Sequence, residues 1–137
     1  MTAESKDMVR QWTDEIYTHK RFERIRYLAH AEYIRHEGTG TWTAPIAEHL
    51  ERIKALYQPG GGKPRLRFAY YLLAEGDKVV GFGTMRGYRG GASKEDEVYS
   101  FVQMFRLAHG KIVETWFPPF VVGVDWRNDP PLRTGPR

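Results

Sequence analysis

The chain has 137 residues, of which 41% are hydrophobic and 28% charged, and a net charge of +4. This composition is typical of one globular domain and argues against a disordered chain, while no apolar run approaches the roughly 20 residues that span a bilayer. The absence of cysteine excludes disulfides, thiol catalysis and Cys-ligated metals. Basic residues are scattered or interleaved with acidic ones and form no long Lys/Arg block, so we expect no nucleic-acid partner. The polar start, MTAESKDMVRQW, lacks a secretory-signal core and favours a cytoplasmic protein.

Three helices are predicted in the first half of the chain. Met8, Trp12 and Ile16 recur at a spacing of four, which indicates an apolar helical stripe. A shorter helix follows, and Pro45 suits the first turn of the third. The predicted helices cover residues 5–19, 22–29 and 45–57. The segment between the second and third, AEYIRHEGTGTW, is predicted as a short extended piece and a turn, with His36 and Glu37 at the rim.

After a Gln-Pro-Gly-Gly-Gly break, the apolar period changes from helical to strand-like. Gly81 and Gly83 lie inside one of these runs and indicate close backbone approach or a bulge. A polar, glycine-containing loop is predicted at 88–96, and an irregular, proline-rich tail begins at about residue 118. The predicted strands cover residues 65–74, 79–87, 97–107 and 111–117.

The last two runs, joined by Ala-His-Gly, are predicted as a β-hairpin. Alternation in the first of them separates two rows of side chains. One row holds Tyr99, Phe101, Gln103, Phe105 and Leu107, and the other holds Val98, Ser100, Val102, Met104 and Arg106. Because Gln103 is an amide in an aromatic row, it must find hydrogen-bond partners or border a cavity.

These elements predict one α+β domain over residues 1–137. Three N-terminal helices would pack on one face of a curved antiparallel sheet and enclose a pocket between the layers. The opposite row of the hairpin strand is apolar, and such a face is costly to leave in water. We therefore expect a homodimer.

Three segments resemble motifs of a known family. They are AEGDKVVGFGTMRG (74–87), FVQMFRLAHGKIVETW (101–116) and YIRHEG (33–38). Together they resemble the SnoaL-like polyketide cyclases of the nuclear transport factor 2-like superfamily, over roughly residues 6–117. The resemblance implies an NTF2-like cone, and a scaffold of this kind hosts cyclases, isomerases, hydrolases, dehydratases and plain binding proteins.

The resemblance also implies site residues, with two departures. It places a pocket histidine at His36, whose ordinary pKa near 6.5 suits proton transfer. Family cyclases commonly carry a general acid/base aspartate where this chain has Gln103, and histidine is frequent where it has Thr115. An amide cannot exchange a proton at useful pH, so the usual aldol-cyclase mechanism does not carry over intact.

The predicted catalytic residues are therefore His36 as the base and Gln103 as a polar organiser. Alternatively, His36 hydrogen-bonds its own turn and Gln103 crosslinks strands in the core. Glu37 is expected to face solvent, and the other histidines, His19, His30, His49 and His109, are expected at the surface. The predicted substrate-binding residues, each of which could instead be core, are of two kinds. Tyr17 and Tyr33 offer phenolic hydrogen-bond donors, and the residues expected to stack on a planar ligand are Trp42, Tyr99, Phe101 and Trp116.

No histidine pair joins a carboxylate at a metal-ligand spacing, and the glycine-rich pieces form no nucleotide-binding unit, so no metal or cofactor is expected. The first functional hypothesis is a cofactor-free enzyme that cyclises, isomerises, hydrates or hydrolyses a polyketide-like or polycyclic apolar molecule. The second is a non-catalytic protein that binds such a molecule, and the third is a protein-interaction module. A second ionisable group in the pocket would favour the first; an all-apolar pocket would favour the second.

Overall fold

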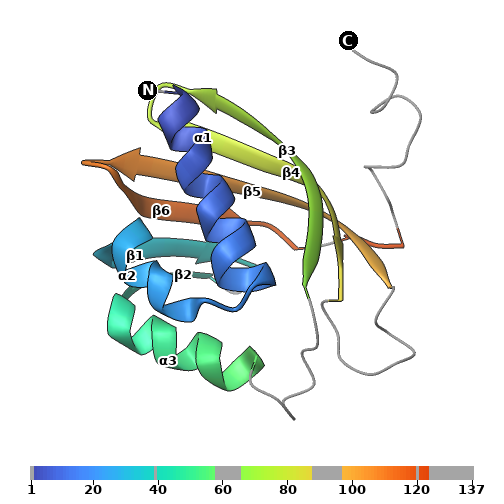
Figure 1. Cartoon of the computed structure of the whole chain (residues 1–137), viewed down its shortest axis with the longest axis horizontal. Helices are drawn as coiled ribbons and strands as arrows, with labels where there is room; N and C mark the ends of the chain where they lie inside the picture. Colours follow the sequence, from blue (N-terminus) through green and yellow to red (C-terminus); the bar gives the residue numbers. More distant parts are fainter. Residues whose placement is uncertain (1, 39, 58–65, 88–96, 120, 124–137) are drawn as a thin grey trace.

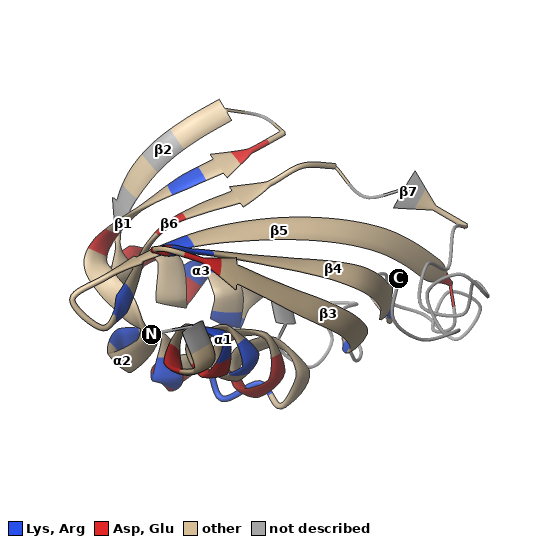
Figure 2. Ribbon diagram, turned by 90° about the horizontal axis from the view of Figure 1, so that it is seen from above, with Lys and Arg blue, Asp and Glu red and all other residues tan. Residues whose placement is uncertain are grey.

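The computed structural model describes residues 2–38, 40–57, 66–87, 97–119 and 121–123. The predicted α+β class is confirmed, because helices cover one face of a curved sheet (Figures 1 and 2). The glycine-rich break after residue 57, the 88–96 loop and most of the tail lie outside the described residues. None of the described helices is long and apolar enough to cross a bilayer.

The first helix changes its winding part-way along. It begins as α1 (Thr2–Arg10) and continues as the π-helix η1 (Gln11–Thr18), with the His19 N–H donating to the Asp14 carbonyl over 2.9 Å. A π-helix bonds residue i to i+5, so residues four and five apart share a face. This winding turns Trp12, Thr13 and Tyr17 toward the same space.

The remaining helical segments lie where the sequence predicts them. A 3₁₀ turn, η2 (Phe22–Arg24), leads into the short α2 (Ile25–Leu28). The third helix, α3 (Ile46–Tyr57), begins directly after Pro45 and packs on β1 and α2. The helices α2 and α3 lie beside the N-terminal part of the sheet, next to the strands at residues 29–45 (Figure 1).

The sheet has the order β2-β1-β6-β5-β4-β3, with β7 paired to β5. Its strands are β1 (Ala29–Glu37), β2 (Gly40–Pro45), β3 (Arg67–Glu75), β4 (Lys78–Arg86), β5 (Val98–Ala108), β6 (Lys111–Phe117) and β7 (Val121–Val122).

The prediction of a purely antiparallel sheet is wrong, because β1 pairs with β6 in parallel. The predicted extended piece at 31–42 is a full hairpin, β1 and β2, that joins the sheet beside the last long strand. Tight turns force neighbouring strands to be antiparallel, but β1 and β6 are far apart in the chain, so no turn sets their relative direction. The sheet is therefore mixed.

Glycine allows close contact between β3 and β4. A Cβ atom on Gly83 would lie 2.2 Å from the Ala69 carbonyl oxygen, whereas one on Gly81 would come closest to the Leu72 side chain, at 3.1 Å. The predicted close backbone approach is confirmed at Gly83, whereas the near neighbour of Gly81 is a side chain.

Two clusters form the hydrophobic core. The larger joins the helices to the sheet and includes Trp12, Ile16, Tyr33, Phe105 and Ile112. The smaller contains Leu66, Met85, Tyr99 and Phe101. Tyr17 packs against both clusters, which marks the place where they meet.

Candidate functional site

A cavity of about 340 Å³ lies between the helices and the sheet, where the two core clusters meet. Small-molecule pockets span roughly 300–1,000 Å³, so a molecule of two or three fused rings is of suitable size. The apolar lining is Trp12, Leu66, Phe68, Met85, Phe117, Pro118 and Pro119, and the polar lining is Thr13, Tyr17, Tyr33, Arg35, Glu37, Gln103 and Thr115.

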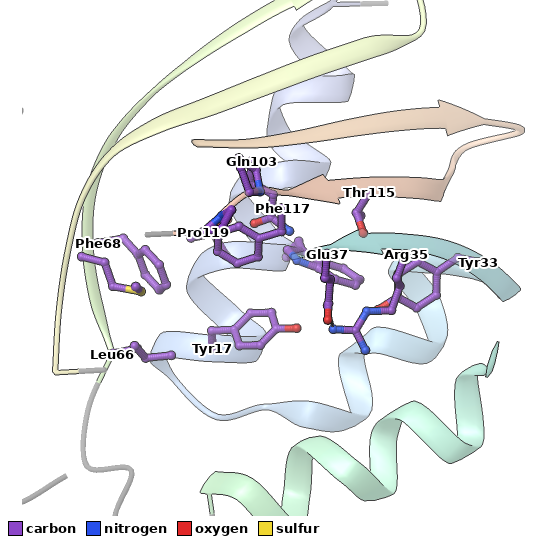
Figure 3. A pocket seen from close by; sticks show the side chains of 14 residues that line it. Tyr17, Tyr33, Arg35, Glu37, Leu66, Phe68, Gln103, Thr115, Phe117 and Pro119 are labelled. Carbon is purple, nitrogen blue, oxygen red and sulfur yellow. Dashed lines mark hydrogen bonds and ion pairs between the residues drawn. The ribbon is translucent and has the colours of Figure 1, made fainter. Parts of the chain in front are cut away.

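Strand alternation brings three polar side chains of β1 to the cavity. Tyr33, Arg35 and Glu37 are two residues apart and all line it (Figure 3). Glu37 was expected to face solvent, but its side chain is only 26% exposed and forms an ion pair with Arg35. The expectation was wrong because β1 extends to residue 37, so Glu37 points to the same face of the strand as Tyr33 and Arg35.

Arg35 and Glu37 make one end of the cavity polar. Arg35 Nη2 donates to the Glu37 carboxylate, and Arg35 Nη1 lies 2.7 Å from His49 Nδ1. The Tyr17 hydroxyl points toward this ion pair from η1 (Figure 3). Among the described residues that line the cavity, Glu37 is the one carboxylate and Arg35 the one permanent cation.

The two tyrosines at this end are neutral hydrogen-bond donors. Burial raises the pKa of Tyr17 to about 12, against the opposing effect of the Arg35 charge. Burial also holds the pKa of Tyr33 well above its ordinary value, and the neighbouring Tyr17 adds to this shift. Neither phenol ionises near neutral pH, so both can donate a proton in a hydrogen bond to an oxygen in the cavity.

Gln103 lies in the cavity wall, on the row of β5 predicted for it. Its amide can donate and accept hydrogen bonds, as can the hydroxyl of Thr115 on β6. The buried indole Nε1 of Trp12 has no hydrogen-bond partner among the described residues. Every one of these groups can donate to a ligand oxygen. The role of Gln103 in catalysis stays a prediction.

His36, predicted as the base, does not line the cavity. It alternates with Arg35 and Glu37 on β1, so its ring lies on the opposite face of the sheet. There Nε2 lies 2.6 Å from a Glu114 carboxylate oxygen and Nδ1 lies 2.7 Å from the Thr41 hydroxyl. Its ring stacks on Trp116, with centroids 5.2 Å apart and planes at 8°.

The other predicted aromatic residues divide between cavity and core. Tyr17 and Tyr33 line the cavity, but Tyr99 and Phe101 are buried in the smaller core cluster and Trp116 is on the outer face with His36. The Tyr99 hydroxyl donates to Glu97 over 2.6 Å. Trp42 belongs to β2, and its side chain lies outside the described part of the molecule.

His49 is the one histidine whose expected surface location is wrong. His19, His30 and His109 are exposed, whereas His49 is 2% exposed on α3. The helix turns this position toward β1, where the His49 and Tyr33 rings pack edge to face with their centroids 5.4 Å apart. Within the described residues, no three His, Asp or Glu side chains gather as a metal site would require.

The sequence reasoning missed Arg35 and Glu37, although the chain carried a signal for them. Once Tyr33 is assigned to the pocket face of a strand, period-two alternation assigns residues 35 and 37 to the same face. No comparable local pattern points to Leu66, Phe68 or Met85, because they reach the cavity through the curvature of the sheet.

Comparison with protein families shows that residues 9–115 match the SnoaL-like domain. Among curated proteins, no significant match to the chain was found. The family match begins at Val9, near the end of α1, and covers the later helices and every long strand up to Thr115 of β6.

Solved structures share the fold at low sequence identity. A provisionally named polyketide cyclase from Acidithiobacillus ferrooxidans is 17% identical, with 88% of each chain covered and a TM-score of 0.70. An LEH-like epoxide hydrolase from M. tuberculosis is 13% identical, with 85% of this chain and 79% of that one covered and a TM-score of 0.70. A provisionally named ketosteroid isomerase from Kribbella flavida is 14% identical, with 99% of this chain and 90% of that one covered and a TM-score of 0.65. Others are described as NTF2-like or cystatin-like, which supports the NTF2-like fold.

Proposed function

The chain belongs to the SnoaL-like domain family, and from that premise we propose that it is a cofactor-free acid/base enzyme acting on a polyketide-like or polycyclic apolar molecule. One observation carries the proposal: Glu37, the one carboxylate among the described lining residues, faces a cavity that combines apolar walls with hydrogen-bond donors, beside Arg35 and the Tyr17 hydroxyl. Glu37 takes the role of base that the sequence suggested for His36, because His36 is on the other side of the sheet.

The proposed step is proton transfer from a carbon next to a carbonyl group. A Glu37 oxygen accepts the proton, the C–H electron pair forms the C=C bond of an enolate, and the carbonyl π electrons move onto oxygen. Tyr17 donates a hydrogen bond to the oxygen on which negative charge develops, which is worth most in a site with little water. Return of the proton to another carbon gives isomerisation. Attack of the enolate carbon on a second carbonyl gives cyclisation, in which the oxygen of that carbonyl receives its π electrons and takes the proton back from Glu37.

The low-polarity walls support a flat, apolar substrate. Phe68 and Phe117 bring aromatic rings to the cavity, and Leu66 and Met85 add aliphatic surface. Such walls bind planar rings by burial of apolar area and leave orientation to a few polar groups. The donors Tyr17, Tyr33 and Gln103 suit a ligand whose polar atoms are oxygens.

A binding protein without catalysis is the second candidate, and the ion pair is the observation that favours it. Arg35 already neutralises the charge of Glu37, so the pair can serve to complete the cavity wall rather than to move protons. Under this alternative the rings of the ligand pack in the cavity, its polar atoms hydrogen-bond to the tyrosines, and the ligand is released unchanged.

Proton exchange separates the two candidates. We expect the protein to accelerate the exchange of the α-protons of 2-tetralone for deuterium in D₂O, at a rate proportional to protein concentration and followed by NMR. This bicyclic ketone is small enough for the cavity and carries one carbonyl group. Saturable binding of 2-tetralone with no acceleration of exchange would reject the enzyme and leave the binding protein.

We also propose that a second copy of the chain covers the outer face of the sheet. Strand register aligns Leu73, Val80, Met104 and Trp116 in one row across this face. Leu73 is 61% and Met104 38% exposed. Acidic and basic residues are few in β4 and β5 and frequent in the helices (Figure 2). The cost of leaving an apolar face of this kind in water supports its assignment as a dimer interface.

For the oligomeric state, we expect wild type to sediment as a dimer at micromolar concentration and Met104→Glu to sediment as a folded monomer. The variant would bury a charge at the centre of the interface. Tyr27→Glu is the matched control, because Tyr27 is 65% exposed on the helical side, and it is expected to remain a dimer. A monomeric wild type would contradict the proposal.

A further inference from the structure

We propose that His49 is a positioning residue, which acts as a neutral hydrogen-bond acceptor to hold Arg35 against Glu37. This inference rests on the proposed function, since it concerns the polar end of the same cavity. His49 does not itself line the cavity, and it approaches Arg35 from α3, the helix packed over β1. Its role is therefore exerted through the Arg35 side chain.

The contacts of His49 determine where its ring proton lies. Nδ1 is 2.7 Å from Arg35 Nη1 and 3.2 Å from Arg52 Nη2. A guanidinium group only donates hydrogen bonds, so Nδ1 must carry the lone pair and Nε2 the proton. Burial lowers the pKa of His49 to about 3, with the charges of Arg35 and Arg52 adding to the effect, so the neutral ring persists at any physiological pH.

Both terminal nitrogens of the Arg35 guanidinium have hydrogen-bond partners. Nη1 meets His49 and Nη2 meets Glu37, and the side chain is only 15% exposed. A guanidinium is planar, so fixing one nitrogen against the His49 ring fixes the direction in which the other nitrogen points. Without an acceptor at His49, the long Arg35 side chain would gain rotamers that leave Glu37 without its partner.

The acceptor role also explains why a histidine is buried here at all. The Nε2 atom is buried and has no hydrogen-bond partner among the described residues. A buried donor without a partner reduces stability, and an aliphatic side chain of similar size would avoid that cost. An aliphatic residue at this position could not supply the lone pair that Nδ1 offers to Arg35.

Two variants separate positioning from packing. His49→Asn places an amide oxygen close to the position of Nδ1 and keeps an acceptor, whereas His49→Leu fills similar space without one. Arg52→Met is the control, because Arg52 also contacts His49 Nδ1 but is exposed and does not line the cavity. Two readouts are used: exchange of the 2-tetralone protons, as kcat and KM separately, and the affinity for 2-naphthol, a planar enol mimic, by fluorescence titration.

We expect His49→Leu to lower kcat and 2-naphthol affinity about 10-fold each, His49→Asn to recover both to within about threefold, and Arg52→Met to change neither. Equal behaviour of His49→Leu and His49→Asn in both readouts overturns the assignment. If 2-naphthol affinity follows this order while wild type exchanges no protons, the positioning role holds and the proposed enzymatic function fails. If wild type exchanges protons and neither variant differs from it, the enzymatic function holds and His49 has no positioning role.

Discussion

Glu37→Gln is expected to slow the exchange of 2-tetralone protons about 10³-fold, within the range by which a positioned base accelerates proton transfer. Glutamine has nearly the same shape as glutamate and can still hydrogen-bond Arg35, but its amide cannot accept a proton from carbon. The affinity for 2-naphthol should change far less, because the walls of the cavity remain intact. The comparison of kcat with binding thus isolates the chemical step.

His36→Asn is the control that tests the placement of the base. His36 contacts Glu114 and Thr41 on the outer face, so its replacement should leave exchange within about twofold of wild type. The family resemblance alone predicts the opposite order, with His36 as the sensitive position. A large loss in His36→Asn together with a small one in Glu37→Gln would remove Glu37 from the mechanism.

Gly83→Ala is expected to destabilise the fold by about 3 kcal/mol or more, because overpacking against rigid backbone cannot be relieved by a side-chain rotation. The new methyl group would lie 2.2 Å from the Ala69 oxygen and 2.7 Å from the Tyr70 Cα atom, both in the backbone of β3. Either β3 and β4 separate or the pairing of Gly83 with Tyr70 is lost. Urea unfolding followed by tryptophan fluorescence measures the change.

Gly81→Ala supplies the matched control on the same strand. Its methyl group would meet Leu72 Cδ2 at 3.1 Å, the end of a flexible side chain that can move by a few tenths of an ångström. We expect a loss of under about 1 kcal/mol for this variant. Similar urea midpoints for Gly83→Ala and Gly81→Ala would contradict the prediction, because they would mean that the backbones of β3 and β4 can separate at Gly83 at little cost.

Most of the elements could be predicted from the sequence, because each depends on a short-range pattern. The fourfold spacing of Met8, Trp12 and Ile16 indicates the first helix, and the alternation from Tyr99 to Leu107 indicates β5. The same alternation assigns Gln103 to the inner face, where the structure has it. Patterns of this kind need only the neighbours of a residue in the chain.

The sequence by itself thus determined the helices, the C-terminal hairpin, the α+β class and the inward side of Gln103. Only the tertiary structure decided which side of β1 faces the cavity, that β1 runs parallel to β6, and that His49 is buried. These features depend on contacts between distant segments, such as the one between His36 and Glu114, 78 residues apart. No local periodicity encodes such a contact, and a one-residue difference in strand phase exchanges His36 for Glu37 in the cavity.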